Sequence, residues 1–277
     1  MNTPSPVSSH ASPHLNTTTL TQHPDGSAGE HAHTVVMLHG WGKNIEVLRS
    51  LGELLVSDSV KVHLIDLPGF GLSPLPHEAS SEGRGWSTDD YANVVLNHLE
   101  AMGLTSYSLI GHSFGGRISV RISARHPERV KSLTLIGSHG IPPERTPLDA
   151  TRLWFIRKIT KVSKWVDENL GLDTFKRYFA PRFGSLDYKM AGDLRKTLVK
   201  TVNEDLTNLA ATISAPTLLL WGEKDPQTPL SIARKFKALI KDSSLFIFPN
   251  KGHEPYLDVG SHLLAKYINR FLQDNLS

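Results

Sequence analysis

This chain has no cysteine among its 277 residues, and it lacks the signatures of several common protein classes. Without a thiol it can form no disulfide, no cysteine nucleophile and no zinc site with Cys ligands. It has no run of about 18 apolar residues, so we predict no membrane-spanning helix and no stable membrane insertion. The net charge is only +3, which is too small to indicate nucleic-acid binding by the whole chain. The remaining composition, 39% hydrophobic and 21% charged, is typical of a globular protein.

Residues 1–33 are rich in Ser, Thr, Pro and His and contain no arginine. They show neither the charged and apolar regions of a secretory signal nor the arginines of a mitochondrial presequence, and we expect a cytoplasmic protein. Because this segment offers few apolar residues for a core, we predict that residues 1–33 form a disordered tail. Its histidines are expected to be solvated and not to bind a metal: His10, His14, His23, His31 and His33.

From Thr34 onward, apolar runs alternate with segments of helical periodicity. The apolar runs predict strands at residues 35–38, 60–65, 107–110, 130–136, 216–221 and 245–248. Helical spacing is found at residues 46–57, 89–102, 229–240 and 256–272. Strands that alternate with helices of about 10–15 residues indicate a parallel sheet with right-handed crossovers. The sequence therefore predicts an α/β fold with about six parallel strands flanked by helices.

The alternation stops after the strand that ends near Ile136. Residues 141–208 contain no strand-like run, only helical patterns, so we predict a core of residues 34–140 and 209–277 with a helical cap at 141–208. One predicted cap helix has an apolar face and an opposite basic face: Phe155, Ile159, Val162 and Val166 against Arg157, Lys161 and Lys164. Between Glu144 and Lys200 there are thirteen Lys or Arg and seven Asp or Glu.

The segment from Ser106 to Arg125 contains the strongest motif of the chain. A short apolar strand leads into Gly-His-Ser-Phe-Gly, and a helical pattern follows. Strand, sharp turn and helix around Gly-x-Ser-x-Gly indicate a nucleophile elbow, in which the serine backbone is strained and its neighbours must be small. Ser113 is therefore predicted to present its hydroxyl at the carboxyl edge of the sheet, with Gly111 and Gly115 allowing the close approach of strand and helix.

A serine hydroxyl needs a base, and the base needs an orienting acid. The loops after the last two predicted strands supply Asp225 and His253, and both loops belong to the edge that carries Ser113. The chain order serine, aspartate, histidine is the order expected for an elbow nucleophile of this kind. Glu223, beside Asp225, is interpreted as a solvated turn residue. Gly137 and the two residues after it, which follow the strand ending at Ile136, offer no carboxylate as an alternative acid.

Other polar residues near these loops have structural interpretations. Asp66 is predicted to brace the Pro-Gly-Phe-Gly turn that follows it. His39 and His112 are interpreted as packing and hydrogen-bonding residues and not as bases. His139, at the start of the predicted cap, is a candidate for contact with a substrate.

From Thr34 to the C-terminus the chain resembles the α/β-hydrolase family. The matching motifs are His-Gly-Trp-Gly at 39–42, Asp-x-Pro-Gly-Phe-Gly-x-Ser at 66–73, the elbow, Gly-x-x-Asp225 and Gly-His253. The resemblance implies that Ser113 attacks an acyl carbonyl, that His253 transfers its proton and that Asp225 orients the imidazole. It also implies an oxyanion hole made by the backbone N–H groups of Trp41 and Phe114.

The resemblance favours hydrolysis of a small-molecule carboxylic ester or thioester without a metal or organic cofactor. The cap is expected to shape the acyl pocket with some of its aromatic residues: Trp154, Phe155, Trp165, Phe175, Tyr178 and Phe179. Carbon–carbon bond hydrolases of the family usually have Trp after the catalytic His, where this chain has Glu254. A ligand sensor with slow turnover is a further alternative.

The predicted basic face has three interpretations: a solvated surface, a docking site for an acidic carrier protein, and a peripheral membrane contact. A carrier is considered because the segment from Val35 to Gly71 is similar to that of the pimeloyl-carrier methyl esterases, which also have a basic cap. The likeness is partial, because their elbow reads Gly-Trp-Ser-Leu-Gly-Gly.

Overall fold

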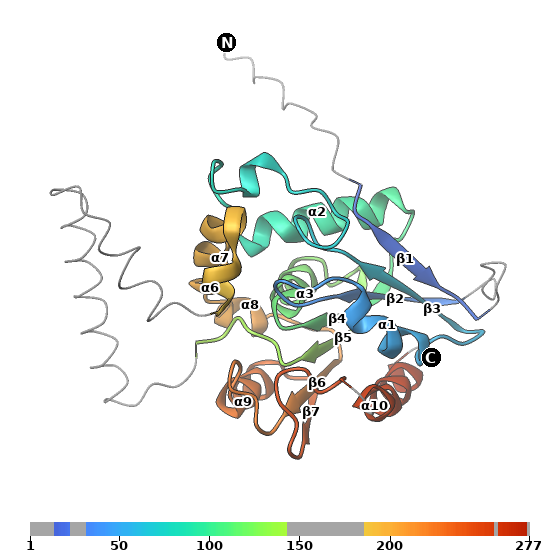
Figure 1. Cartoon of the computed structure of the whole chain (residues 1–277). Coiled ribbons are helices and arrows are strands. Elements are labelled where there is room, and N and C mark those ends of the chain that lie inside the picture. Colours follow the sequence, from blue (N-terminus) through green and yellow to red (C-terminus); the bar gives the residue numbers. More distant parts are fainter. Residues whose placement is uncertain (1–13, 23–31, 143–185, 258–259, 276–277) are drawn as a thin grey trace, which may run out of the picture.

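The computed structural model describes residues 14–22, 32–142, 186–257 and 260–275. Seven strands form one sheet in the order β1-β3-β2-β4-β5-β6-β7 (Figure 1). All neighbouring pairs are parallel except β1 and β3. The strands are β1 (Thr17–Leu20), β2 (His33–Leu38), β3 (Val60–Ile65), β4 (Tyr107–His112), β5 (Val130–Ile136), β6 (Thr217–Gly222) and β7 (Ser243–Phe248). The predicted α/β fold with a mostly parallel sheet is confirmed.

Helices cover both faces of this sheet. They are α1 (Glu46–Glu53), α2 (Thr88–Ala101), α3 (Phe114–Arg125), α9 (Leu230–Leu239) and α10 (Gly260–Asn275). Successive strand residues point to opposite faces, so the uninterrupted apolar run of β2 serves two cores. Val36 and Leu38 belong to the core under α2, α3 and α9, whereas Val35 and Met37 belong to the core under α1 and α10. Burial on both faces explains why the strands are apolar without alternation.

The start of α2 illustrates how local sequence sets an element boundary. Ser87 is the N-cap: its hydroxyl accepts a hydrogen bond from the Asp90 N–H, and the Asp90 carboxylate accepts one from the Ser87 N–H at 2.7 Å. This reciprocal pair satisfies two backbone donors that have no partner within the helix. The helix therefore begins at Thr88, one residue before the predicted start at residue 89.

The prediction of a disordered tail at residues 1–33 is wrong for residues 14–22 and for His33, which begins β2 and lies 2.9 Å from the Ser108 hydroxyl through Nε2. Within residues 14–22, β1 pairs antiparallel with β3 and adds a seventh strand to the six parallel strands of the described sheet. Leu15 is buried, and Asn16 donates to the Asp66 carboxylate at 2.7 Å. The β-branched threonines of β1 suit an edge strand, but the segment carries too few apolar residues to be distinguished from a polar tail by its pattern alone.

The predicted cap is described from residue 186 onward, and it is helical there. Its elements are α6 (Leu186–Met190), the 3₁₀ turn η3 (Gly192–Leu194), α7 (Arg195–Val202) and, at its end, α8 (Thr207–Ala210). The predicted basic helix with Arg157, Lys161 and Lys164 and the predicted pocket aromatics lie outside the described residues.

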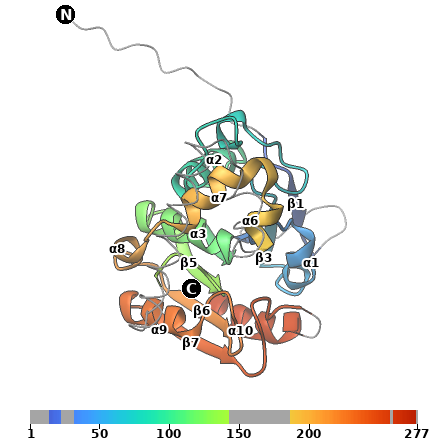
Figure 2. The same cartoon turned by 60° about the vertical axis from the view of Figure 1, so that its left-hand side comes forward.

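The described part of the cap is fastened to the core. The Thr197 hydroxyl of α7 accepts a hydrogen bond from the Trp86 N–H at 2.8 Å. Trp86 lies in the loop that precedes α2 and contains the 3₁₀ turn η1 (His77–Ala79). Figures 1 and 2 both show α7 beside α2. Where the chain returns to the core, the Leu206 N–H donates to the Gly140 carbonyl at 2.8 Å. None of the helices in the described part of the chain is long and apolar enough to span a bilayer.

Candidate active site

The turn between β4 and α3 has the geometry predicted for an elbow. Ser113 has φ of 51° and ψ of −106°, a region that costs a non-glycine residue about 1–3 kcal/mol. A Cβ on Gly115 would lie 2.2 Å from the Leu38 carbonyl oxygen, and one on Gly111 would lie 2.5 Å from Ser119 Oγ. Only glycine fits at these positions, because β2, β4 and α3 converge there. The turn holds Ser113 at the carboxyl edge of the sheet.

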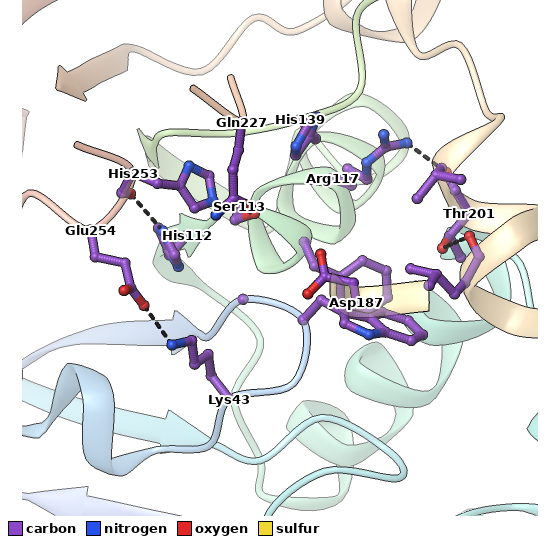
Figure 3. A pocket seen from close by; sticks show the side chains of 15 residues that line it. Lys43, His112, Ser113, Arg117, His139, Asp187, Thr201, Gln227, His253 and Glu254 are labelled. Carbon is purple, nitrogen blue, oxygen red and sulfur yellow. Dashed lines mark hydrogen bonds and ion pairs between the residues drawn. The ribbon is translucent and has the colours of Figure 1, made fainter. Parts of the chain in front are cut away.

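The structure brings Ser113, Asp225 and His253 together in one hydrogen-bonded row. Figure 3 shows His253 beside Ser113. His253 Nε2 lies 2.9 Å from Ser113 Oγ, and His253 Nδ1 lies 2.8 Å from Asp225 Oδ2. Asp225 follows β6 and His253 follows β7, so the two loops meet the elbow at the same edge of the sheet. Side chains separated by 140 positions in the sequence are thus in direct contact.

The environment of Asp225 favours the carboxylate. Burial alone would raise its pKa, but hydrogen bonds from His253 and Thr228 outweigh burial and hold the pKa below the ordinary value. The Gln227 and Thr228 N–H groups donate to Oδ1 at 2.8 and 2.9 Å. A carboxylate only accepts hydrogen bonds, so Nδ1 of His253 carries the proton that faces it. Nε2 is then unprotonated and accepts the Ser113 hydroxyl hydrogen.

The backbone N–H groups of Trp41 and Phe114 lie on the two segments that flank Ser113. The Gly115 N–H donates to the His39 carbonyl at 3.0 Å and ties the elbow to the loop after β2. The Trp41 ring packs edge-on against Phe114 at 5.1 Å and against Phe70 at 5.0 Å between ring centroids. Among the described residues, no acceptor is recorded for the N–H of either Trp41 or Phe114. The two N–H groups remain candidates for an oxyanion hole.

The histidines interpreted as structural are buried and fully engaged. His39 Nδ1 donates to the Gly40 carbonyl at 2.7 Å, and its Nε2 accepts the Leu67 N–H at 3.0 Å. His112 Nε2 donates to the His253 carbonyl at 3.0 Å, and its Nδ1 accepts the Tyr256 hydroxyl at 3.2 Å. With both ring nitrogens occupied, neither residue is available as a base toward a substrate.

The two carboxylates interpreted as structural also have structural partners. Asp66 Oδ1 accepts the Ile45 N–H at 2.8 Å, and its Oδ2 accepts the Leu72 N–H at 2.9 Å, so it braces the turn as predicted. Glu223 is exposed and accepts the Asn250 N–H at 3.0 Å. Neither carboxylate is hydrogen-bonded to His253, which leaves Asp225 as its carboxylate partner.

The buried histidines predict how stability depends on pH. Burial lowers the pKa of His39 to about 4 and, with His253 beside it, that of His112 to about 3. In the unfolded chain both would titrate near the ordinary value of about 6.5. Between pH 6.5 and 4 the unfolded state therefore binds more protons, and the free energy of unfolding falls as the pH is lowered through this window. Within this window each such histidine lowers the free energy of unfolding by up to about 1.4 kcal/mol for each pH unit of acidification.

We expect urea unfolding to give a steadily lower free energy of unfolding from pH 7 to pH 4.5. The variant His112→Gln has one titrating site fewer. The slope of its free energy of unfolding against pH should therefore correspond to the uptake of about one proton fewer on unfolding. A free energy that is constant over this range, or a slope unchanged in His112→Gln, would contradict the assignment.

A cavity of about 210 Å³ opens above Ser113. His139 lines it, in agreement with its interpretation as a candidate for substrate contact. The further lining residues that were not identified from the sequence include Lys43, Arg117, Asp187 and Gln227. Arg117 had a usable signal, because it lies four residues after Ser113 and so on the same face of α3. The others lie in loops or in the cap, where periodicity gives no information about direction.

Comparisons with known proteins agree with this geometry. The family model of the alpha/beta hydrolase fold matches residues 33–179, and a model described as TAP-like protein matches residues 195–276. The chain is 30% identical to the pimeloyl-[acyl-carrier protein] methyl ester esterase of Chromobacterium violaceum, over 80% of this chain and 88% of that protein. It is 27% identical to the AB hydrolase superfamily protein YisY of Bacillus subtilis, over 86% and 92% of the two chains.

Solved structures show the same architecture. A membrane phospholipase A, described as a bacterial virulence factor, superposes with a TM-score of 0.69 at 26% identity and covers 95% of this chain and 87% of its own. A thermophilic esterase from Thermogutta terrifontis gives a TM-score of 0.65 at 18% identity, over 95% and 94% of the chains, and supports the fold alone. Because a family model covers more than half of the sequence, the chain belongs to the α/β-hydrolase family, and named esterases are among its relatives.

Proposed function

We propose that this protein hydrolyses carboxylic esters through an acyl-enzyme intermediate on Ser113. The observation that carries the proposal is the continuous row of hydrogen bonds from the Ser113 hydroxyl through His253 to the buried Asp225 carboxylate. A neutral imidazole that accepts from a hydroxyl on one side, and donates to a carboxylate on the other, is poised to act as a general base.

In the first half of the reaction, Ser113 Oγ attacks the ester carbonyl carbon and its proton moves to His253 Nε2. The carbonyl oxygen becomes an oxyanion, which accepts hydrogen bonds from the Trp41 and Phe114 N–H groups. One such donor is worth about 2.7–4 kcal/mol in the transition state. Asp225 offsets the positive charge of the imidazolium. The tetrahedral intermediate then collapses, and the alkoxide leaves with the proton held by His253.

In the second half, a water molecule replaces the alcohol. His253 takes a proton from this water, and the hydroxide attacks the acyl carbon bound to Ser113. Collapse of the second intermediate breaks the bond to Ser113 Oγ, which recovers a proton from His253, and the carboxylic acid is released. Water is the only co-reactant, and every group returns to its starting state.

The substrate class within the esters is a separate question. The relative from Chromobacterium violaceum is named for a methyl ester linked to an acyl-carrier protein, so carrier-linked esters are a second candidate class. The excess of basic residues between Glu144 and Lys200 supports this class, because carrier proteins of this kind are acidic.

The mechanism is tested with a fluorophosphonate, which phosphonylates an activated serine and loses fluoride. We expect one label per chain, located on Ser113 by peptide mass spectrometry, together with steady multiple turnover of p-nitrophenyl butyrate. A label on another residue would remove Ser113 from its role. A single burst without further turnover would favour a ligand sensor on the same scaffold over an esterase.

A further inference from the structure

The cavity above Ser113 contains a buried positive charge that the proposed mechanism does not use. Four charged side chains line it: Lys43, Arg117, Asp187 and Glu254. Lys43 and Glu254 form an ion pair at 2.9 Å, which neutralises both. Arg117 is only 6% exposed. Figure 3 shows the ion pair on one side of Ser113 and Arg117 with Thr201 on the other.

Arg117 has backbone partners but no carboxylate partner in the described part of the chain. Its Nη1 donates to the Thr201 carbonyl at 2.6 Å and to the Glu204 carbonyl at 3.4 Å. The Glu204 carboxylate is engaged elsewhere, with Arg121 at 3.0 Å and with the Thr88 N–H at 3.0 Å. No acceptor among the described residues is recorded for Nε or Nη2 of Arg117. Three of the five guanidinium N–H bonds are therefore left over.

A buried guanidinium without a carboxylate partner lowers the stability of the folded protein. Removing such a charge from water costs several kcal/mol, and two carbonyl oxygens recover only part of this. Burial lowers the pKa of Arg117 to about 10, although the nearby Glu204 acts to raise it. The group is nevertheless a cation at neutral pH. An incoming anion would complete its set of partners.

The position of Arg117 fits a role toward the substrate. It lies one helical turn after Ser113, about 6 Å further along the axis of α3. His139 and Gln227 line the same cavity, and burial lowers the pKa of His139 to about 3, so this imidazole is neutral. A neutral imidazole supplies one N–H donor and adds no competing charge. The cavity thus places polar donors and the Arg117 cation close to the reacting hydroxyl, and the Asp187 carboxylate also lines it.

We propose that this site recognises esters that carry a second, ionised carboxylate, and that Arg117 is the side chain that binds it. The proposal rests on the proposed function and specifies its substrate class as half-esters of short dicarboxylic acids. A guanidinium matches a carboxylate with parallel N–H donors, which gives both energy and orientation. Holding the free carboxylate at Arg117 would place the ester carbonyl one helical turn away, at Ser113.

The test compares monomethyl succinate, glutarate and adipate with their amides, in which the carboxylate is replaced by a neutral group of the same shape. We expect kcat/KM to be about tenfold to hundredfold higher for the acid at the best chain length, as for a hydrogen-bonded charge. Arg117→Met should abolish this preference, and Arg117→Lys should retain part of it. Equal kcat/KM for acid and amide in the native enzyme would overturn the proposal, and so would a preference that survives in Arg117→Met.

Two controls separate recognition from the anchoring of α7. Arg121→Met removes a neighbouring arginine of α3 that pairs with Glu204 but does not line the cavity, so it should leave the acid-to-amide ratio unchanged. The native enzyme gives a readout that needs no variant: glutarate should inhibit hydrolysis of p-nitrophenyl acetate more strongly than glutaramate. Equal inhibition by the two compounds would count against the anion site.

A binding measurement distinguishes failure of this inference from failure of the proposed function. Calorimetric titration of Ser113→Ala with monomethyl glutarate does not depend on turnover. Binding of the acid, with weaker binding of its amide, supports the anion site even if no ester is hydrolysed. Equal binding of acid and amide overturns the anion site even if neutral esters are good substrates.

Discussion

Ser113→Ala is expected to lower kcat for p-nitrophenyl butyrate by about 10⁶, as for the serine of comparable triads. The hydroxyl is the atom that forms the bond to the acyl group, and no other hydroxyl is within hydrogen-bond distance of His253 in the described residues. The methyl group of alanine fits where the serine side chain lies, so the fold should be retained. Initial rates under saturating substrate measure the effect, and a thermal melt verifies the fold.

Ser123→Ala is the matched control for this substitution. Ser123 is also on α3 and is buried, but its hydroxyl has no hydrogen-bond partner among the residues that the structure describes. Its removal should leave kcat unchanged and should not lower stability, because an unsatisfied buried hydroxyl stabilises nothing. Turnover of Ser113→Ala above about one per cent of the native value would rule out an acyl-enzyme on Ser113.

Asp225→Asn is expected to lower kcat by about 10⁴ with little change in structure. The amide oxygen can replace Oδ1, which accepts the Gln227 and Thr228 N–H groups. The amide NH₂ then faces His253 Nδ1, where a carboxylate oxygen lies in the native protein. A donor at this place requires Nδ1 to be the unprotonated nitrogen, so the proton moves to Nε2. An imidazole with a proton on Nε2 cannot accept the Ser113 hydroxyl hydrogen.

The alternative acid is tested by Glu223→Gln in the same loop. Its side chain keeps an oxygen to accept the Asn250 N–H, so the turn should persist. We expect its kcat to stay within a factor of two of the native value. A large loss in Glu223→Gln, together with a small loss in Asp225→Asn, would reverse the roles of the two carboxylates.

The features that were predictable from the sequence are those with a local steric or topological cause. Gly111 and Gly115 indicate the elbow because any larger residue would collide with Leu38 or Ser119. Asp225 and His253 could be placed beside the serine because parallel strands end at one edge of a sheet. These inferences need only the strand order along the chain and the identity of the residue after each strand.

The features that were missed depend on contacts between distant parts of the chain. The strand β1 owes its place to the unpaired edge of β3 and to the Asp66 carboxylate, and neither leaves a trace in the sequence around Thr17. The final helix was predicted to begin at Tyr256 but begins at Gly260. Tyr256 instead reaches His112, at a distance of 3.2 Å between hydroxyl oxygen and Nδ1. The direction of a long side chain such as Arg117 is likewise set by its tertiary partners.

The hydrogen bond between the Leu206 N–H and the Gly140 carbonyl joins the two ends of a long excursion from the sheet. Because the two ends of the insert are in contact, an unrelated sequence can replace it without changing the strand order of the sheet. The entropic cost of closing a loop grows only slowly with its length, so inserts of different lengths are tolerated. The insert can therefore be replaced at this junction, in natural variants or by design. A chimera that carries the insert of another esterase between these two residues would keep the hydrolytic edge while its substrate range changes.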